Sequence, residues 1–497
     1  MMRIRPIRPR QACAAFCLVL ACVVAGPLAA QDRPAPATPA VAAPAPARDL
    51  PLLSITDCVR IALESSPSLA ISDERRHAAS QDVTAAYGAF LPDINLSRSW
   101  QKSERTDFDV QQYETGQAPF YSYDSAGDST LWFMQTLSPL GLADETINTK
   151  YKDWAGSATL NLFNGFAKFS SLGSARHQLA AAVATRDYTR ELVVQDVVMA
   201  YYNLLRAEEL LKVAFETRDQ AAKELERTET YFRLGSAAKS DVLQQRVRLE
   251  NTRLDVVVAD NGVKMAFADL AYAMNRPLAA TFRVDPSVLE TDFFVPEVEV
   301  LYEDALARRL DLQSGEHAAE ARRKDITTAT SGIWPRLDLS VRYSRYDNES
   351  PYRFGSQTSD NTSWGYAVNW NVFDRLQTLT GRSKAKANAR IAEYELDQAR
   401  LNVQVEIRQL HNTMVEARER AGVSRETIVQ SEEELRLAQE RFRVGAGTTL
   451  DIIVAQANLA NARGQEVRAT ADFLMARAQL HRATGRLSPW TGGTGPQ

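Results

Sequence analysis

A glycine-centred turn that occurs twice constrains the fold of this 497-residue chain more than any other feature. The two copies occupy residues 231–243 and 441–453, and each has a glycine followed six residues later by an aspartate: Gly235 and Asp241, Gly445 and Asp451. Glycine ends helices because it adopts the left-handed conformation without a steric penalty. An aspartate near the start of the next helix accepts hydrogen bonds from free amides of the first turn. Each copy therefore predicts the sharp turn of a helical hairpin, and the spacing of 210 residues predicts a tandem repeat.

Long helical patterns surround both turns. Apolar residues at spacings of three and four predict a helix over residues 166–232 and a return helix over 241–274. At about 1.5 Å per residue the first helix would be roughly 100 Å long, whereas helices average about 11 to 12 residues. The second repeat predicts the same hairpin over 375–484. Shorter helices are predicted over residues 54–89, with a break at Pro67, and over 299–309 and 312–330.

The hydrophobic period changes to two ahead of each long helix. Alternating residues predict one β-hairpin over about 91–163 and another over about 335–373, each with an apolar side and a polar side. Residues 102–130 are polar and predict a long surface loop, followed by an extra short strand at 132–137. Residues 347–362 predict a shorter loop in the second hairpin. The expected fold class is therefore α+β.

The N-terminus predicts export. Residues 1–30 combine four arginines, an apolar run and a small-residue cleavage site, as a secretory signal peptide does. A membrane anchor is disfavoured because the apolar run is shorter than the roughly 20 residues needed to span a bilayer. Lipoprotein processing at Cys22 is an alternative that stays open. Residues 31–50 are rich in Ala and Pro and predict a disordered lead, and residues 488–497 predict a disordered tail.

Charge and cysteine content narrow the classes of partner. Removal of the signal peptide takes the net charge from -4 to about -8, which argues against nucleic-acid binding. It also leaves Cys58 as the only cysteine, so no intrachain disulfide is expected. Beyond the signal peptide no apolar run is long enough for a transmembrane helix. The residue pattern of the strands must therefore distinguish a periplasmic or secreted protein from an outer-membrane protein.

The strands favour a lipid-exposed barrel. Alternation with aromatic residues on the apolar side and a polar opposite side is typical of outer-membrane barrels. The aromatic residues expected at the membrane interface are Trp100, Trp154, Tyr343, Trp364 and Trp370. A soluble sandwich with one-sided burial is the alternative for each strand alone. Arg98 departs from the pattern: it falls on the apolar side, where it would extend to the interface or be costly at the midplane.

Four strands cannot close a barrel around a channel. Open strand edges are not tolerated in lipid, so the chain must combine strands across subunits. Three copies would give 12 strands, with room for a channel, although two or four copies also satisfy the periodicity. The long helices need partners along their apolar stripes, and in a ring of subunits they would form a tube continuous with the barrel.

Several short motifs, in order and in duplicate, resemble the TolC-like outer membrane efflux protein family. They are the stretch 55–67, Phe90-Leu91-Pro92, Leu162-Phe163-Asn164-Gly165, Arg308-Arg309-Leu310-Asp311-Leu312 and the two glycine turns. The resemblance covers about residues 53–487. It implies a first repeat over 51–276, a collar connection at 277–298 and a second repeat over 299–487.

The family resemblance also implies an activity and partners. It implies a homotrimer with a 12-stranded transmembrane β-barrel in outer-membrane lipid and a long periplasmic α-helical barrel. The expected function is a passive duct of a tripartite efflux or type I secretion system. Energy would come from an inner-membrane pump of the RND, ABC or MFS type, joined through a periplasmic adaptor. The cargo is not indicated by the sequence.

The turns are then expected to be the periplasmic tips. By resemblance, the positions that contact the adaptor are Leu234, Gly235, Val444 and Gly445. Asp241 and Asp451 match acidic positions near the pore constriction, and helix capping is an alternative role that is compatible with it. The second tip carries Gly447, Thr448, Thr449 and Val454. If the gate depends on charge, we expect the first tip to contribute more of it.

The sequence offers little for an enzyme. Five histidines are scattered without metal-ligand spacing, and nucleophile, phosphate-loop and dinucleotide motifs are absent from the sequence. We therefore expect no catalytic residue, cofactor or metal. Two other classes stay open: a periplasmic coiled-coil scaffold without a channel, and an outer-membrane enzyme with a site at the barrel rim.

Overall fold

A computed structural model describes residues 52–277, 282–286, 293–349 and 357–486. The predicted signal peptide, the Ala/Pro-rich lead, the tail and Cys22 lie outside the described residues, as does part of the connection 277–298. The description below concerns the unit that begins at Pro51.

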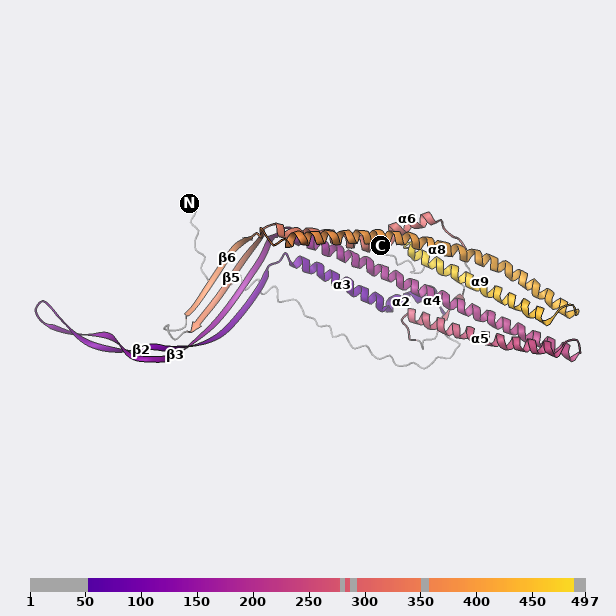
Figure 1. The fold of residues 1–497 in the computed structure, drawn as a ribbon, viewed down its shortest axis with the longest axis horizontal. Coiled ribbons are helices and arrows are strands. Elements are labelled where there is room, and N and C mark those ends of the chain that lie inside the picture. Colours follow the sequence, from indigo (N-terminus) through magenta and orange to yellow (C-terminus); the bar gives the residue numbers. More distant parts are fainter. Residues whose placement is uncertain (1–51, 278–281, 287–292, 350–356, 487–497) are drawn as a thin grey trace. The chain divides into compact units, whose positions relative to one another are not determined.

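The described elements follow one order twice: two short helices, a β-hairpin, a very long helix and a return helix (Figure 1). In the first half they are β1 (Leu52–Leu53), α2 (Ile55–Ser65), α3 (Pro67–Gly88), β2 (Asp93–Tyr123), β3 (Ser129–Asn164), α4 (Ala167–Arg233) and α5 (Lys239–Ala273). In the second half they are β4 (Arg283–Val284), α6 (Val298–Arg308), α7 (Leu310–Thr330), η2 (Ser331–Ile333), β5 (Arg336–Glu349), β6 (Gln357–Asn369), α8 (Gln377–Arg443) and α9 (Thr449–Ala483). This order is the one that a tandem repeat requires, and the tandem repeat itself stays a prediction.

The two β-hairpins form one antiparallel sheet in the order β2-β3-β5-β6. The prediction of a long loop over residues 102–130 was wrong, because β2 continues to Tyr123 and β3 begins at Ser129. Residues 132–137 belong to β3 and are not a separate strand. A two-stranded ribbon needs no apolar side, so its sequence lacks the alternation that marks a half-buried strand. The predicted loop 347–362 was also too long, since β5 extends to Glu349 and β6 begins at Gln357.

The last predicted strand ends earlier than its alternation suggested. β6 stops at Asn369, which pairs with Arg336, so Trp370 lies beyond the strand. The residue that would pair with Trp370 is Pro335, and proline has no N–H to continue the ladder. The indole Nε1 of Trp370 instead donates to the carbonyl of Ile333 at 3.1 Å.

The helical hairpins match their predicted limits closely. Helices α4 and α8 have 67 residues each, and the return helices α5 and α9 have 35 each. The return helices begin two residues before Asp241 and Asp451. The predicted break at Pro67 is present because this proline starts α3, where its missing N–H costs nothing. None of the helices in the described ranges is both long and apolar enough to cross a membrane.

Three apolar clusters hold the helices together in the described part of the chain. The largest joins α2, α4, α5 and α9 around Tyr201 and Tyr202, and it includes the free thiol Cys58. The hydroxyl of Tyr201 donates to the carbonyl of Asp285 at 3.0 Å and accepts from its amide at 2.9 Å, which fastens the chain after β4 to α4. A second cluster joins α6, α7, α8 and α9, and a third lies between α8 and α9 near their turn.

Candidate functional site

Two matching turns connect the long helices to the return helices. Gly235 has φ 79° and Gly445 has φ 78°, the left-handed conformation that the sequence predicted. The amides that follow donate back to the preceding turn, Ser236 to the Tyr231 carbonyl and Ala446 to the Arg441 carbonyl, both at 2.9 Å. These are the bonds of a glycine-terminated helix.

The residues just before these glycines project outward. Leu234 is 74% exposed and Val444 is 68% exposed. The adjacent glycines have open space where a side chain would begin. Each turn therefore presents a highly exposed apolar side chain next to a glycine that has no side chain, as a contact site for another protein would.

Asp241 and Asp451 act as helix caps. Asp241 accepts from the backbone amide of Ala238 at 3.0 Å. Asp451 accepts from the Thr448 amide at 2.8 Å and from the Thr448 hydroxyl at 2.9 Å. These bonds to Thr448 lower the pKa of Asp451 below its ordinary value. Capping is thus the local role of both carboxylates, and the second is held by one more hydrogen bond than the first.

Contacts between the two hairpins lie close to the turns. The rings of Tyr231 on α4 and Phe442 on α8 are 5.9 Å apart. Two turns further from the tip, the carboxylate of Glu224 accepts from Gln439 Nε2 at 2.6 Å and pairs with Arg227 at 3.0 Å. Glu224 is only 5% exposed, and burial raises its pKa, opposed by Arg227 and Gln439.

A second bridge between the hairpins centres on Arg463 of α9. Its guanidinium pairs with Glu216 of α4 at 3.1 Å and with Glu432 of α8 at 2.8 Å. Neither bridge was predicted, because their partners lie on different hairpins at sequence separations of about 215 and 247 residues. Aligning the two repeats and comparing the faces of their helices could have identified these two bridges.

A buried ion network joins the middle of the helices. Arg309, 6% exposed, pairs with Asp311 at 2.7 Å and with Glu406 of α8 at 2.6 Å. Arg482 of α9 also pairs with Glu406 and donates to the Tyr188 hydroxyl of α4 at 3.1 Å. No individual role was predicted for the residues of the motif around Arg309.

One glutamate beside this network has a strongly shifted pKa. Burial raises the pKa of Glu191 to about 7, with Asp311 and Asp187 adding to the shift and Arg482 and Arg309 opposing it. Glu191 therefore changes charge near neutral pH, whereas an ordinary glutamate is ionised there.

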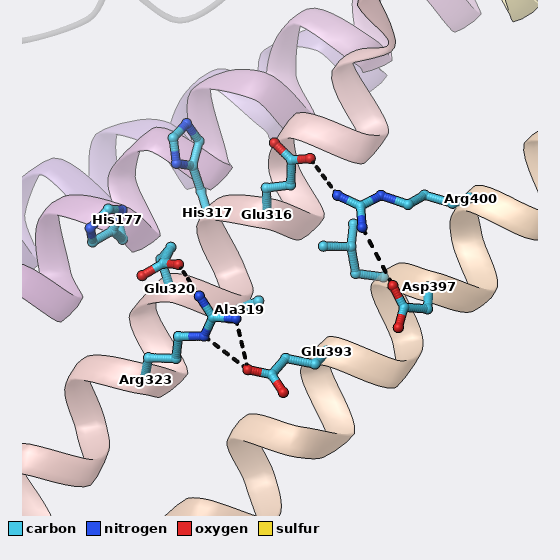
Figure 2. Close-up of a pocket in the computed structure, with 10 residues that line it drawn as sticks. His177, Glu316, His317, Ala319, Glu320, Arg323, Glu393, Asp397 and Arg400 are labelled. Atoms are coloured by element: carbon cyan, nitrogen blue, oxygen red, sulfur yellow. Dashed lines mark hydrogen bonds and ion pairs between the residues drawn. The ribbon is translucent and has the colours of Figure 1, made fainter. Parts of the chain in front are cut away.

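A hollow of about 590 Å³ lies between α4, α7 and α8. Charged side chains gather along it (Figure 2). Arg323 pairs with Glu320 at 2.5 Å and with Glu393 at 2.9 Å, and Arg400 pairs with Glu316 at 2.9 Å. The rings of His177 and His317 lie 5.9 Å apart at its edge. Within the described ranges no group of three or more His, Cys, Asp or Glu side chains is placed to hold a metal ion. The acids here are paired with arginines, so the hollow is an ion-paired helix contact.

The sheet has the two unlike faces that the strands predicted. Directly paired residues share a face, and one row of pairs joins Ile94, Ala158, Val341 and Trp364. Two residues further along each strand the row is Leu96, Gly156, Tyr343 and Thr362. The opposite face carries Asn95, Ser157, Arg342 and Ser363. Four of the five predicted interface aromatics, Trp100, Trp154, Tyr343 and Trp364, lie on the apolar face, and Trp370 lies past the end of β6.

Arg98 lies where the apolar rows give way to a charged one. Its pairing row contains Trp154, Arg345 and Asp360. The guanidinium is 4.7 Å from the centre of the Trp154 ring. A cation over an indole is a favourable contact. Arg98 therefore marks a border of the apolar band.

Comparison with known proteins gives a consistent result. The sequence model of the family described as "Outer membrane efflux protein" matches residues 58–276 and 301–486. The chain is 23% identical to outer membrane protein TolC of Vibrio cholerae, over 86% of this chain and 89% of the relative. It is 24% identical to protein CyaE of Bordetella pertussis, over 88% and 84%. The structure of outer membrane protein VceC from Vibrio cholerae superposes with a TM-score of 0.69 at 18% identity, over 87% of this chain and 96% of that one.

Proposed function

The chain belongs to the outer membrane efflux protein family, and on that premise we propose that three copies of it form a passive duct across the outer membrane. Family membership places the protein in the outer membrane of a Gram-negative bacterium, with a large periplasmic part. The proposed duct carries substrates delivered by an inner-membrane pump and a periplasmic adaptor, in efflux or in type I secretion. A relative described as a probable efflux pump outer membrane protein supports the use in efflux.

The four-stranded sheet with two unpaired edges carries this proposal. In the order β2-β3-β5-β6, the outer edges of β2 and β6 have no partner within the described part of the chain. Unpaired backbone groups are not tolerated in lipid, so each edge must pair with another copy. Three copies supply about 12 strands, which leaves room for a channel lined by the polar face.

The helical hairpins supply the periplasmic part of the proposed duct. Helices α4 and α8 extend roughly 100 Å at the usual rise. In a ring of three copies they would enclose a tunnel that continues the barrel. Conduction needs only this open path, and the pump provides the energy.

The turns form the proposed docking tips. Leu234 and Val444 are exposed apolar side chains beside Gly235 and Gly445. An adaptor with an apolar surface would bury these two side chains when it binds the tips. The proposed constriction includes Asp241 and Asp451 as capped carboxylates. Because Asp451 is held by Thr448, the Asp241 carboxylate of the first tip has more freedom to face the pore.

Conductance measurement tests the proposed function. The protein is extracted from outer membranes with detergent, purified and inserted into planar lipid bilayers. Single-channel steps that scale with salt concentration are expected. The scaffold alternative expects release from membranes by salt or urea and no conductance. A detergent-extracted oligomer that gives no channel steps would refute the duct.

A further inference from the structure

The β2–β3 hairpin continues beyond the four-stranded sheet. Pairing of β3 with β5 ends at Lys150 and Glu349, whereas β2 and β3 stay paired as far as Tyr123 and Ser129 (Figure 1). About 20 residues per strand at roughly 3.3 Å per residue give a two-stranded ribbon of the order of 65 Å.

The end of this ribbon is a built turn. The side chain of Asp124 accepts from the amides of Ala126 at 2.8 Å and Asp128 at 2.9 Å. Gly127, at φ 88°, supplies the left-handed position. Next to the turn, the Trp132 indole donates to the Ser122 hydroxyl at 2.9 Å. Ordered pairing thus reaches the tip.

Charge changes sharply along the ribbon. We call residues 115–123 and 129–140 the distal ribbon; their sequence contains no Asp, Glu, Lys or Arg. The section nearest the sheet is charged, with Lys102, Glu104 and Lys150 among its residues. The turn at the end carries Asp124 and Asp128, so the uncharged distal ribbon lies between a charged base and a charged tip and has a different environment from both.

Both faces of the distal ribbon carry large apolar side chains. Phe120 pairs with Trp132 on one face, and Tyr121 pairs with Leu131 on the other. Phe133 shares the face of Tyr121 and Leu131, opposite Pro119. Phe120, Tyr121, Trp132 and Phe133 are between 46% and 61% exposed. An exposed apolar surface of this kind marks a contact with a partner.

The presence of apolar side chains on both faces indicates which kind of partner covers the distal ribbon. A ribbon lying on a lipid surface would be apolar on one face only, and an open hairpin inside a bilayer would leave its edges unpaired. A ring of three copies gives every ribbon two neighbours. The ribbon also continues β2, whose edge is one of the two that the proposed ring joins. We infer that the distal ribbons of neighbouring copies pack against one another outside the membrane and extend the outer mouth of the duct, an inference that rests on the proposed function.

Photocrosslinking in intact outer membranes tests this inference. Benzoylphenylalanine is placed at Phe120 in one full-length variant and at Phe133 in another, so that the two faces are probed with an aromatic probe. Irradiation is expected to give covalent dimers and trimers of this chain from both positions. A probe at Thr106, in the charged section, is the control. It is expected to give much less crosslinked product than the probes at Phe120 and Phe133. Crosslinks only to lipopolysaccharide, or none at Phe120 and Phe133, overturn the inference.

A second variant separates the inference from the proposed function. Combined Tyr121→Ser and Phe133→Ser removes aromatic side chains from one face and leaves β5, β6 and the helices untouched. The probe at Phe120 lies on the face that stays intact. The variant is still expected to give less crosslinked dimer and trimer, because each contact between neighbouring ribbons pairs one face of one copy with the other face of the next. Undiminished product contradicts face-to-face packing. A conducting trimer without ribbon crosslinks overturns the inference alone, whereas a monomer overturns the proposed function as well.

Discussion

Glu224 on α4 accepts a hydrogen bond of 2.6 Å from Gln439 on α8, and the pair joins the two helical hairpins near their tips. Because Glu224 is buried, loss of this hydrogen bond would leave a buried polar group without a partner, which destabilises the folded state. With the Tyr231–Phe442 ring contact and the Arg463 bridge, it holds the tips of one copy together. We propose that opening of the duct at its periplasmic end loosens these contacts.

Removing the acceptor oxygens of the Glu224 side chain is therefore expected to favour the open tip. Glu224→Ala leaves the Gln439 amide without this partner, at a cost to the joined tips of about 1 to 3 kcal/mol. Single-channel recording should show a higher open fraction. Glu224→Gln keeps an acceptor oxygen and should resemble the wild type. Glu226→Ala removes an exposed carboxylate from the same helix and serves as control; an effect equal to that of Glu224→Ala would contradict a specific bond.

Glu191 predicts how stability depends on pH. Burial raises its pKa from 4.5 to about 7 in the folded protein. Between these values the folded state binds more protons than the unfolded state, so this group makes stability fall as pH rises from about 4.5 to about 7.

The variant that checks this is Glu191→Gln, which stays neutral at every pH. Thermal unfolding should show it to be more stable than the wild type at pH 8 and nearly equal to it at pH 4.5. Glu226→Gln, on the exposed side of the same helix, should follow the wild-type profile. An unchanged difference between Glu191→Gln and wild type across this pH range would show that Glu191 does not titrate as proposed.

The turn glycines are expected to be needed for adaptor docking. Gly235→Val and Gly445→Val place a β-branched residue at positive φ, which costs on the order of 1 to 2 kcal/mol at each turn. We expect weaker crosslinking to the periplasmic adaptor, with the larger loss in the double variant. Gly262→Ala in α5 is the matched control, since that helical position has free space for a methyl group. Adaptor crosslinking that survives both valines would argue against docking at the tips.

Two neighbouring arginines, one buried and one exposed, allow the contributions of a buried and an exposed charge to stability to be compared. Arg309→Met leaves Asp311 without its arginine partner and Glu406 with Arg482 alone, and it should destabilise the folded chain by about 3 kcal/mol or more. Arg308→Met removes an exposed arginine one position earlier and should change stability by less than about 1 kcal/mol. Denaturant unfolding in detergent measures both. Equal effects would mean that the buried network does not hold α7, α8 and α9 together.

The helical hairpins were predictable because their signals are local. Gly235 and Gly445 need a left-handed backbone, and apolar periodicity fixes the helix on either side. The ribbon was missed because both of its faces are exposed and periodicity reports only one-sided burial. The early end of β6 depended on Pro335, the residue that would have paired with Trp370 from another strand. Glu224 and Gln439 were missed because no local pattern records a contact between helices of different hairpins.

The number of copies in the assembly tests the central claim most directly. Native mass spectrometry of the full mature protein, released from detergent micelles, counts the chains in each intact complex. The predicted result is one dominant species with three chains, since three four-stranded sheets close the barrel that a single sheet leaves open. A dominant species with one, two or four chains would contradict the trimeric duct.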